Sequence, residues 1–271
     1  MTPKLETAFY EIGRLDSLSH RNTVAHRLDP RVKVAVTFFF ILAVVSYGKY
    51  EISGLIPFFF LPVLVIGLAN LPAGYLFRKL LIVSPFVLFI GIFNPLLDRQ
   101  IIQTIGEIDI TGGWISFASL TLKFMLTVGA ALLLIATTGF PAICMALEKM
   151  GAPKVFTVQL LMLYRYLFVL TEEGFRMLRA HTLRSFSGKK IGAKVFLQLL
   201  GNLLLRTLDR AQRIHMSMLS RAFTGEIRLC RKNIFSIKEV IFLTLSLLLI
   251  CSFRFIKITE IIGNILLEAI R

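Results

Sequence analysis

The stretch that decides the fold runs from Ile115 to Thr138 and reads ISFASLTLKFMLTVGAALLLIATT. An α-helix needs about 20 mainly apolar residues to cross a bilayer, and this stretch is long enough. Its one charge is Lys123. That residue lies near one end, so its long side chain is expected to reach the membrane interface. The stretch therefore predicts a transmembrane helix.

Four further apolar runs predict additional spans. The whole chain is 56% hydrophobic and only 17% charged, whereas soluble domains carry about 25% charged residues. We therefore predict an all-α polytopic membrane protein with about five transmembrane helices. The four other spans cover about 34–47, 54–71, 80–97 and 240–253.

One more apolar stretch, Val155–Leu170, is interpreted differently. Arg165 lies in its middle, and a central arginine costs roughly 2.5–3.5 kcal/mol on insertion scales. We predict a helix at the membrane base or in a cytoplasmic domain rather than a span.

The charges between the spans predict the topology. Loops rich in Lys and Arg stay on the cytoplasmic side. The N-terminal arm and the connection around 72–79 are basic, whereas the connection after the third span is acidic. Residues 141–234 carry sixteen Lys and Arg against five Asp and Glu. We therefore expect a cytoplasmic N-terminal arm (1–33), four spans (34–140), cytoplasmic helices (141–234) and a last span with its tail (235–271). The C-terminus is expected outside the cell membrane.

The cytoplasmic segment contains a near-repeat. Residues 184–188 read Arg-Ser-Phe-Ser-Gly, and residues 221–225 read Arg-Ala-Phe-Thr-Gly. Both follow amphipathic helical patterns, and both end in Gly, a common stop after a helix. The simplest interpretation of each is an arginine that complements a helix C-terminus. The duplication favours a second interpretation, in which two similar tips bind a partner with two similar pockets, because Arg and aromatic residues often anchor interfaces.

Several kinds of chemistry lack a motif in this sequence. It has no phosphate-binding Gly-x4-Gly-Lys-Ser/Thr loop, no His-Glu-x-x-His and no cysteine cluster. The predicted spans contain no carboxylate or histidine that could carry protons or sodium. The net charge of +15 raises the question of nucleic acid, but the basic residues alternate with spans and no nucleic-acid-binding motif accompanies them. We expect membrane lipid rather than nucleic acid as a partner, and no catalytic activity.

At this point the chain resembles the CbiQ-type transmembrane (T) components of energy-coupling factor transporters, a class of ABC transporter serving cobalt and nickel uptake. The resemblance extends from about residue 14 to 255. It rests on Leu28-Asp29-Pro30-Arg31-Val32-Lys33, Thr137-Thr138, Ala146–Pro153 (ALEKMGAP), Tyr164-Arg165-Tyr166, Leu183-Arg184-Ser185 and Ser220-Arg221-Ala222. For the Asp29-Pro30 pair, an N-cap and a proline at the first helical position are a sufficient account.

The resemblance implies a scaffold in the cell membrane of a prokaryote. It would join two copies of an ABC ATPase to a substrate-binding membrane subunit of the CbiM or NikM kind, with or without a small accessory subunit. It implies no cofactor in this chain, because ATP and magnesium would be bound by the ATPases. In the family, Ala-Arg-Gly-like motifs end two coupling helices that dock on the ATPases. By position, the docking residues are Arg184, Ser185, Phe186, Arg221, Ala222 and Phe223.

The mechanism expected from this resemblance is mechanical coupling, in which closure of the ATPases moves the helix tips and thereby the membrane helices. Two alternatives stay open. One is a stand-alone secondary carrier or a membrane-embedded enzyme. The ionisable residues available for such a site are Asp16, His20 and Asp29. The other is a membrane anchor that recruits a soluble dimer. Cobalt and nickel remain equally open as substrates.

Overall fold

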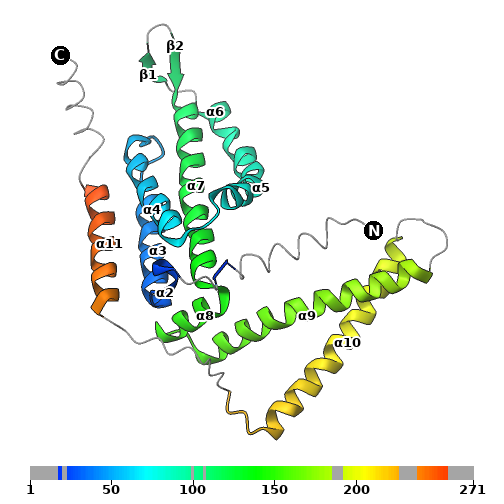
Figure 1. Ribbon diagram of the computed structural model, residues 1–271. Helices are drawn as coiled ribbons and strands as arrows, with labels where there is room; N and C mark the ends of the chain where they lie inside the picture. Colours follow the sequence, from blue (N-terminus) through cyan, green and yellow to red (C-terminus); the bar gives the residue numbers. More distant parts are fainter. Residues whose placement is uncertain are drawn as a thin grey trace. The chain divides into compact units, whose positions relative to one another are not determined.

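The protein is a helical membrane protein in the described residues, which are 18–19, 23–98, 101–105, 108–184, 192–225 and 237–255 of a computed structural model (Figure 1). Its helices are α2 (Val24–Arg27), α3 (Pro30–Val45), the 3-10 helix η1 (Ser53–Phe59), α4 (Phe60–Ala69), α5 (Ala73–Gly91), α6 (Phe93–Leu97), α7 (Gly112–Thr138), α8 (Phe140–Lys149), α9 (Lys154–Arg184), α10 (Ala193–Ser220) and α11 (Ile237–Phe255).

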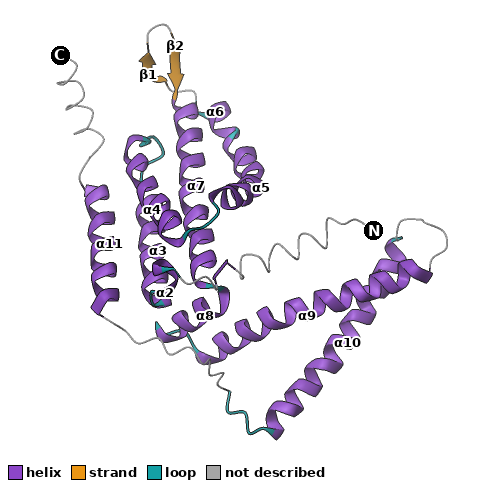
Figure 2. Ribbon diagram, in the orientation of Figure 1, coloured by secondary structure: helices purple, strands orange, loops and turns teal. Residues whose placement is uncertain are grey.

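The predicted all-α class is confirmed, with one small addition. Strands β1 (Ile101–Ile105) and β2 (Ile108–Thr111) form an antiparallel hairpin just before α7 (Figure 2). The sequence analysis treated this segment only as an acidic connection. Among the described residues, these are the only strands.

The chain divides into two compact units. One contains α8, α9 and α10, and the other contains the remaining helices and the hairpin. The division falls between Gly139 and Phe140. Gly139 has a φ of 78°, in the left-handed region that glycine adopts without steric cost. It therefore ends α7 and allows the chain to change direction.

Each of the five apolar runs predicted to span the membrane is helical, as α3, η1 with α4, α5 with α6, α7 and α11. By length and composition, three helices of the described part can cross a membrane: Ala73–Leu96, Gly112–Thr138 and Lys154–Arg184. The first two match predicted spans, and Ser53–Ala69 is a shorter apolar helix.

The third helix, α9, is not one of the five predicted spans. It belongs to the same unit as α8 and α10. Its Arg165 is exposed, and its second half carries several charged residues, including Glu172 and Glu173. By length and composition α9 can span a membrane, and its charged residues favour a position outside it. That residues 155–170 lie outside the membrane stays a prediction.

The start of α3 follows from its sequence. Asp29 is the N-cap, and its Oδ1 accepts a hydrogen bond from the Arg31 backbone N–H at 2.8 Å. Pro30 occupies the first helical position, where its missing N–H costs nothing and its fixed φ suits the helix. The N-cap account of the Asp29-Pro30 pair is confirmed.

The core of the larger unit lies where α3, η1, α7 and α11 meet. Val32, Val36, Phe40 and Val44 recur every four residues on α3 and are buried, so they form one face of the helix. The fully buried Phe58 of η1 packs its ring against several aromatic rings. The ring centroids lie 5.7 Å from Phe40, 5.6 Å from Tyr47 and 5.8 Å from Phe253.

Gly113 allows α6 and the start of α7 to approach closely. A Cβ at this position would lie 2.5 Å from Pro95 Cα, 2.7 Å from the Asn94 carbonyl oxygen and 2.8 Å from the Asp98 carbonyl oxygen. These neighbours are backbone atoms that cannot rotate away. The Gly113 N–H instead donates to the Asp98 carbonyl at 3.1 Å. Only glycine fits this contact without a backbone shift.

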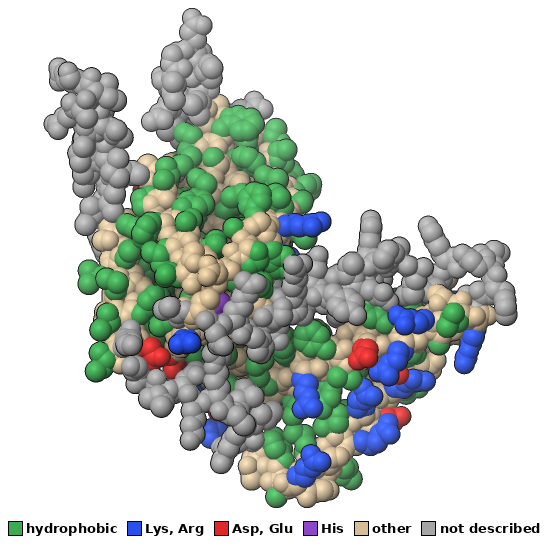
Figure 3. Space-filling view, in the orientation of Figure 1, with side chains coloured by type: hydrophobic (Ala, Val, Ile, Leu, Met, Phe, Trp, Pro, Cys, Tyr) green, Lys and Arg blue, Asp and Glu red, His purple; other side chains and the backbone are tan. Residues whose placement is uncertain are grey.

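The outer faces of the membrane helices carry many exposed apolar side chains. Phe60 of α4, Phe86 and Phe89 of α5, and Leu245 and Leu248 of α11 are all more than half exposed. Hydrophobic side chains cover much of the visible surface of this unit (Figure 3). Apolar surface of this extent is expected to face lipid or a partner in the membrane rather than water.

In the smaller unit, a tight turn joins the end of α8 to the start of α9. The Gly151 N–H donates to the Glu148 carbonyl at 3.1 Å, and the Ala152 N–H donates to the Leu147 carbonyl at 3.0 Å. With Gly151 at a φ of 115°, these bonds form the Schellman motif that commonly ends helices. The ALEKMGAP segment is thus the end of α8 and the entry to α9. The rings of Phe140 and Tyr164 stack at 4.8 Å between the two helices.

Candidate functional site: the C-terminal ends of α9 and α10

The first predicted docking tip is the end of α9. Arg184 is the last residue of this helix, and it is exposed, as is Leu183 beside it. Ser185 and Phe186, also predicted as docking residues, lie outside the described residues. The structure therefore places Arg184 at a helix end, as the sequence predicted for this repeat.

The second predicted tip, at the end of α10, is described completely. The Phe223 N–H donates to the Met218 carbonyl at 3.0 Å, and the Ala222 N–H donates to the Leu219 carbonyl at 3.0 Å. These two bonds define a Schellman motif with Arg221 as the C-cap and Ala222 as the left-handed residue. Ala222 has a φ of 53°, a conformation usually taken by glycine.

This geometry separates the two interpretations of Arg221. An arginine that serves only as a cap would use its guanidinium to bind the last helical carbonyls. Here backbone N–H groups bind the carbonyls of Met218 and Leu219. Within the described part of the chain, the side chains of Arg184 and Arg221 form no hydrogen bond or ion pair. Both exposed guanidinium groups are therefore available to a partner.

The two arginines lie at opposite ends of α10. Residues 185–192 connect Arg184 to the start of this helix, and Arg221 directly follows its last residue (Figure 1). The helix has 28 residues, so at 1.5 Å per residue it is about 42 Å long. One small pocket cannot hold both tips at this spacing. Two separate pockets are needed.

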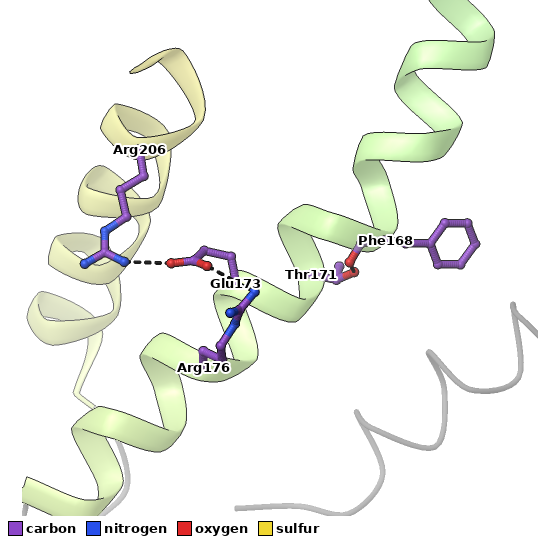
Figure 4. A network of polar contacts seen from close by, with 5 residues as sticks. All are labelled: Phe168, Thr171, Glu173, Arg176 and Arg206. Carbon is purple, nitrogen blue, oxygen red and sulfur yellow. Dashed lines mark hydrogen bonds and ion pairs between the residues drawn. The ribbon is translucent and has the colours of Figure 1, made fainter. Parts of the chain in front are cut away.

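An ion-pair network joins α9 to α10. Oε1 of Glu173 accepts from Arg206 of α10 at 2.6 Å, and its Oε2 lies 3.4 Å from Arg176 of α9 (Figure 4). Both arginine side chains are 62% exposed, so each pair contributes only about 0.2–1 kcal/mol. The network sets the alignment of the two helices more than their stability. On α9, the Thr171 hydroxyl in the same view donates to the Phe168 carbonyl at 2.9 Å.

A shallow basic groove adjoins this network. It has a volume of about 270 Å³. Its lining residues are Leu170, Glu173, Arg206, Thr207, Arg210 and Arg213.

Helix α10 has an apolar face that nothing in the described chain covers. None of its residues is buried. Leu197, Leu204, Leu205, Leu208 and Met216 are each more than half exposed. A helix with one strongly apolar face is stable when that face packs against another surface. In the described chain, this face of α10 is therefore available for packing against another surface.

Among the described residues, no group of three or more His, Cys, Asp or Glu side chains could hold a metal ion. Lys123, which is expected to reach the membrane interface, donates to the carbonyls of Tyr47 and Gly48 at 2.6 and 3.3 Å. These carbonyls follow the end of α3.

The sequence analysis missed one polar cluster. Lys33 is buried, and it donates to the carbonyls of His26 and Thr137 at 3.3 and 3.0 Å. His26 is buried beside it, with Nε2 3.0 Å from the Leu18 carbonyl oxygen. The signal in the sequence was a lysine on the same helical face as Val36 and Phe40, where a core residue would be expected.

Comparison with known proteins agrees with the resemblance. Residues 21–232 match the CbiQ family, described as cobalt transport protein. The energy-coupling factor transporter transmembrane protein EcfT of Ruminiclostridium cellulolyticum is 28% identical over 221 residues, which cover 75% of this chain and 81% of the relative. EcfT of Bacillus subtilis is 26% identical over 75% of this chain and 82% of the relative. The cobalt transport protein CbiQ of Salmonella typhimurium is 30% identical over 40% of this chain and 48% of the relative.

Proposed function

Because the chain belongs to the CbiQ family of cobalt transport proteins and is a transmembrane component of an energy-coupling factor transporter, we propose that it couples ATP hydrolysis to uptake. In this proposal it transmits motion from two ATPase subunits to a substrate-binding membrane subunit. The substrate is a transition-metal ion, cobalt or nickel. The chain itself is not catalytic, and the ATPases bind the nucleotide and magnesium.

The observation that carries this proposal is the free guanidinium of Arg221 on a helix end capped by its own backbone. A cap that needs no side chain leaves the arginine for another role. Arg184 occupies the corresponding place at the end of α9. Arginine binds carboxylates and backbone carbonyls through several donors in a fixed plane, which suits insertion into a groove on another protein. Two such tips about 40 Å apart along α10 suit a partner that is itself a dimer.

The lengths of α9 and α10 support a mechanical role. Helix α9 has 31 residues and α10 has 28, so each extends over about 40–47 Å. A continuous helix transmits displacement along its axis with little bending. The ion pair between Glu173 and Arg206 links the two helices, near the middle of α10. When the ATPases close on ATP, both tips move, and the helices carry that motion toward the membrane.

The exposed apolar face of α10 supports the second interaction. The proposed substrate-binding subunit is a membrane protein, so it offers apolar surface near the bilayer. The leucines of α10 could pack against such a surface and bury their side chains. The ATPases would then bind the polar tips while the substrate-binding subunit contacts the apolar face.

The proposed orientation follows from charge. Residues 141–234 carry sixteen basic residues, and positively charged segments stay in the cytoplasm. The α8–α10 unit and the N-terminus are therefore assigned to the cytoplasmic side of a prokaryotic cell membrane. Soluble ATPases reach the tips only with this orientation.

The test replaces both arginines by glutamate, Arg184→Glu with Arg221→Glu. The complex is purified through a tag on this chain, and the ATPase subunits that accompany it are quantified. We expect them to be lost, because the reversed charges repel the groups that bind arginine. Arg210→Glu with Arg213→Glu is the matched control, since it makes the same charge change on α10 away from its end, at the half-buried Arg210 and the exposed Arg213.

Four results would contradict the proposal. The first is unchanged ATPase recovery with the tip variant. The second is equal loss with the control variant. The third is substrate uptake by this chain without any ATPase, which would instead favour a stand-alone carrier. A complex that assembles but hydrolyses ATP without transport would favour the membrane-anchor alternative.

A further inference from the structure

Two lysines join α3 and α7 in a reciprocal arrangement. Lys33, near the start of α3, donates to the carbonyl of Thr137 at the end of α7, at 3.0 Å. Lys123, in the first half of α7, donates to the carbonyls of Tyr47 and Gly48 just beyond the end of α3, at 2.6 and 3.3 Å. Lys33 therefore binds a carbonyl in the last turn of α7, and Lys123 binds the first two carbonyls after the C-cap of α3. The pairing also shows that α3 and α7 are antiparallel.

Elementary helix chemistry explains why lysines occupy these positions. The last four carbonyls of an α-helix have no partner within the helix, and the helix dipole makes that end partly negative. An ammonium group supplies three donors and a positive charge. The contacts of Lys33 are buried, so its charged donor is worth more there than at the surface.

The last turn of α7 is closely tied down. The Thr137 hydroxyl donates to the Leu133 carbonyl at 2.7 Å, and the Gly139 N–H donates to the Ile135 carbonyl at 2.9 Å. The Lys33 ammonium then binds the Thr137 carbonyl itself. Its second bond, to the His26 carbonyl at 3.3 Å, connects the end of α2 to the same point.

The two lysine contacts differ in where they lie along the chain. Thr137 is two residues before Gly139, the residue at which the membrane unit ends and α8–α10 begins. Tyr47 and Gly48 lie in the connection from α3 to η1, within the membrane unit. The lysines make the same kind of contact, but only the Lys33 contact adjoins the exit to the coupling helices.

We propose that Lys33 is a positioning residue that fixes the end of α7, so that motion of the coupling helices turns about Gly139 instead of unwinding the last turn of α7. Lys123 stabilises the same helix pair without this role. The proposal rests on the proposed coupling function, since it concerns how that motion enters the membrane helices. Without Lys33, the Thr137 carbonyl loses its hydrogen-bond donor and the last turn of α7 becomes weaker. Motion of the coupling helices then unwinds this turn and reaches the membrane helices only in part.

The experiment compares Lys33→Met with Lys123→Met in the complete transporter complex, reconstituted in proteoliposomes. Three quantities are measured: ATPase recovery, Co²⁺ uptake per ATP hydrolysed, and backbone amide hydrogen exchange. For Lys33→Met we expect exchange in the last turn of α7 to rise by about tenfold or more, because a hydrogen bond to a charged group is lost. Uptake per ATP should fall severalfold while ATPase recovery stays unchanged.

The control should behave differently. For Lys123→Met we expect faster exchange around residues 46–50 and unchanged uptake per ATP. Lys33→Arg keeps a charged donor and should retain both exchange protection and coupling. If Lys33→Met does not accumulate in the membrane, Lys33→Gln is measured in its place, because it keeps an uncharged donor group.

Two outcomes would overturn the proposal. Unchanged exchange at the end of α7 in Lys33→Met would show that the lysine does not hold this turn. An equal loss of uptake per ATP in Lys33→Met and Lys123→Met would show that only general stability is involved. Failure of the proposed function is distinguishable, because it appears as unchanged ATPase recovery in the Arg184 and Arg221 variant, and the exchange measurement is independent of the substrate.

Discussion

Replacing Ala222 by glycine is expected to strengthen the end of α10. Ala222 has a φ of 53°, and an L-residue in the left-handed region loses about 1–2 kcal/mol to contact between its Cβ and the following carbonyl. Glycine removes this cost, but it gains about 0.5–1 kcal/mol of conformational freedom in the opened state. The net stabilisation is therefore about 0.5–1 kcal/mol. The methyl group of Ala222 is exposed, so no packing is lost.

Amide hydrogen exchange at Phe223 measures this effect directly. The Phe223 N–H donates to the Met218 carbonyl in the Schellman motif, and it exchanges when that motif opens. A stabilisation of about 0.5–1 kcal/mol slows its exchange by about two- to fivefold at 25 °C. The comparison is made after correction for the intrinsic exchange rate beside glycine. ATPase recovery should be unchanged, because Arg221 keeps its place.

Ala211→Gly is the matched control. It makes the same chemical change at another exposed residue of α10, but inside the helix, where glycine costs about 0.5–1 kcal/mol relative to alanine. Exchange around residue 211 should therefore become faster, by about two- to fivefold. Faster exchange at Phe223 in Ala222→Gly would refute the left-handed conformation at residue 222, and with it the backbone cap that frees Arg221.

Two further predictions concern packing and reactivity. Gly113→Ala places a Cβ 2.5 Å from Pro95 Cα and should destabilise the protein by several kcal/mol, on the order of 2–4. Gly129→Ala lies inside α7 with its nearest neighbour at 4.0 Å, so it should instead stabilise the protein by up to about 1 kcal/mol, the helix preference for alanine over glycine. Thermal unfolding in detergent separates the two, and equal melting temperatures would contradict the close contact. Burial raises the pKa of the Cys144 thiol, so the reactive thiolate is scarce at neutral pH. Its alkylation should be slow at pH 7 and accelerate by about tenfold per pH unit up to that raised pKa. With the other cysteines replaced, a Lys149→Cys variant on the exposed end of the same helix should react much faster, and equal rates would contradict the burial.

The helices could be predicted because their signals are local. Asp29 and Pro30 predict the start of α3 from capping chemistry alone, and the apolar run from Ile115 to Thr138 predicts nearly all of α7. The near-repeat at residues 184 and 221 likewise predicts two helix ends with an arginine at each. All of these features depend on neighbouring residues or on a few turns of helix.

The hairpin and the end of α10 could not be predicted in the same way. The segment 101–111 is rich in isoleucine, but it has no sustained alternation, and a short acidic run before a span predicts only a connection. At the end of α10, alanine gives no signal of a left-handed residue, since glycine is the residue that normally marks a Schellman motif. Only the backbone geometry revealed that the cap is complete without the side chain of Arg221.

The sequence by itself determined that this is a helical membrane protein with a basic segment in which two helices each end at an arginine. Hydrophobicity, charge asymmetry and helix capping act over short distances along the chain, so they can be read directly. Only the tertiary structure decided what the polar residues of the membrane unit do. The bond from Lys33 to Thr137 joins residues 104 positions apart, and no local pattern records such a partner. The contacts of Lys33 and Lys123 depend on the antiparallel packing of α3 and α7. That packing brings the Lys33 ammonium to the last turn of α7 and the Lys123 ammonium to the carbonyls that follow α3.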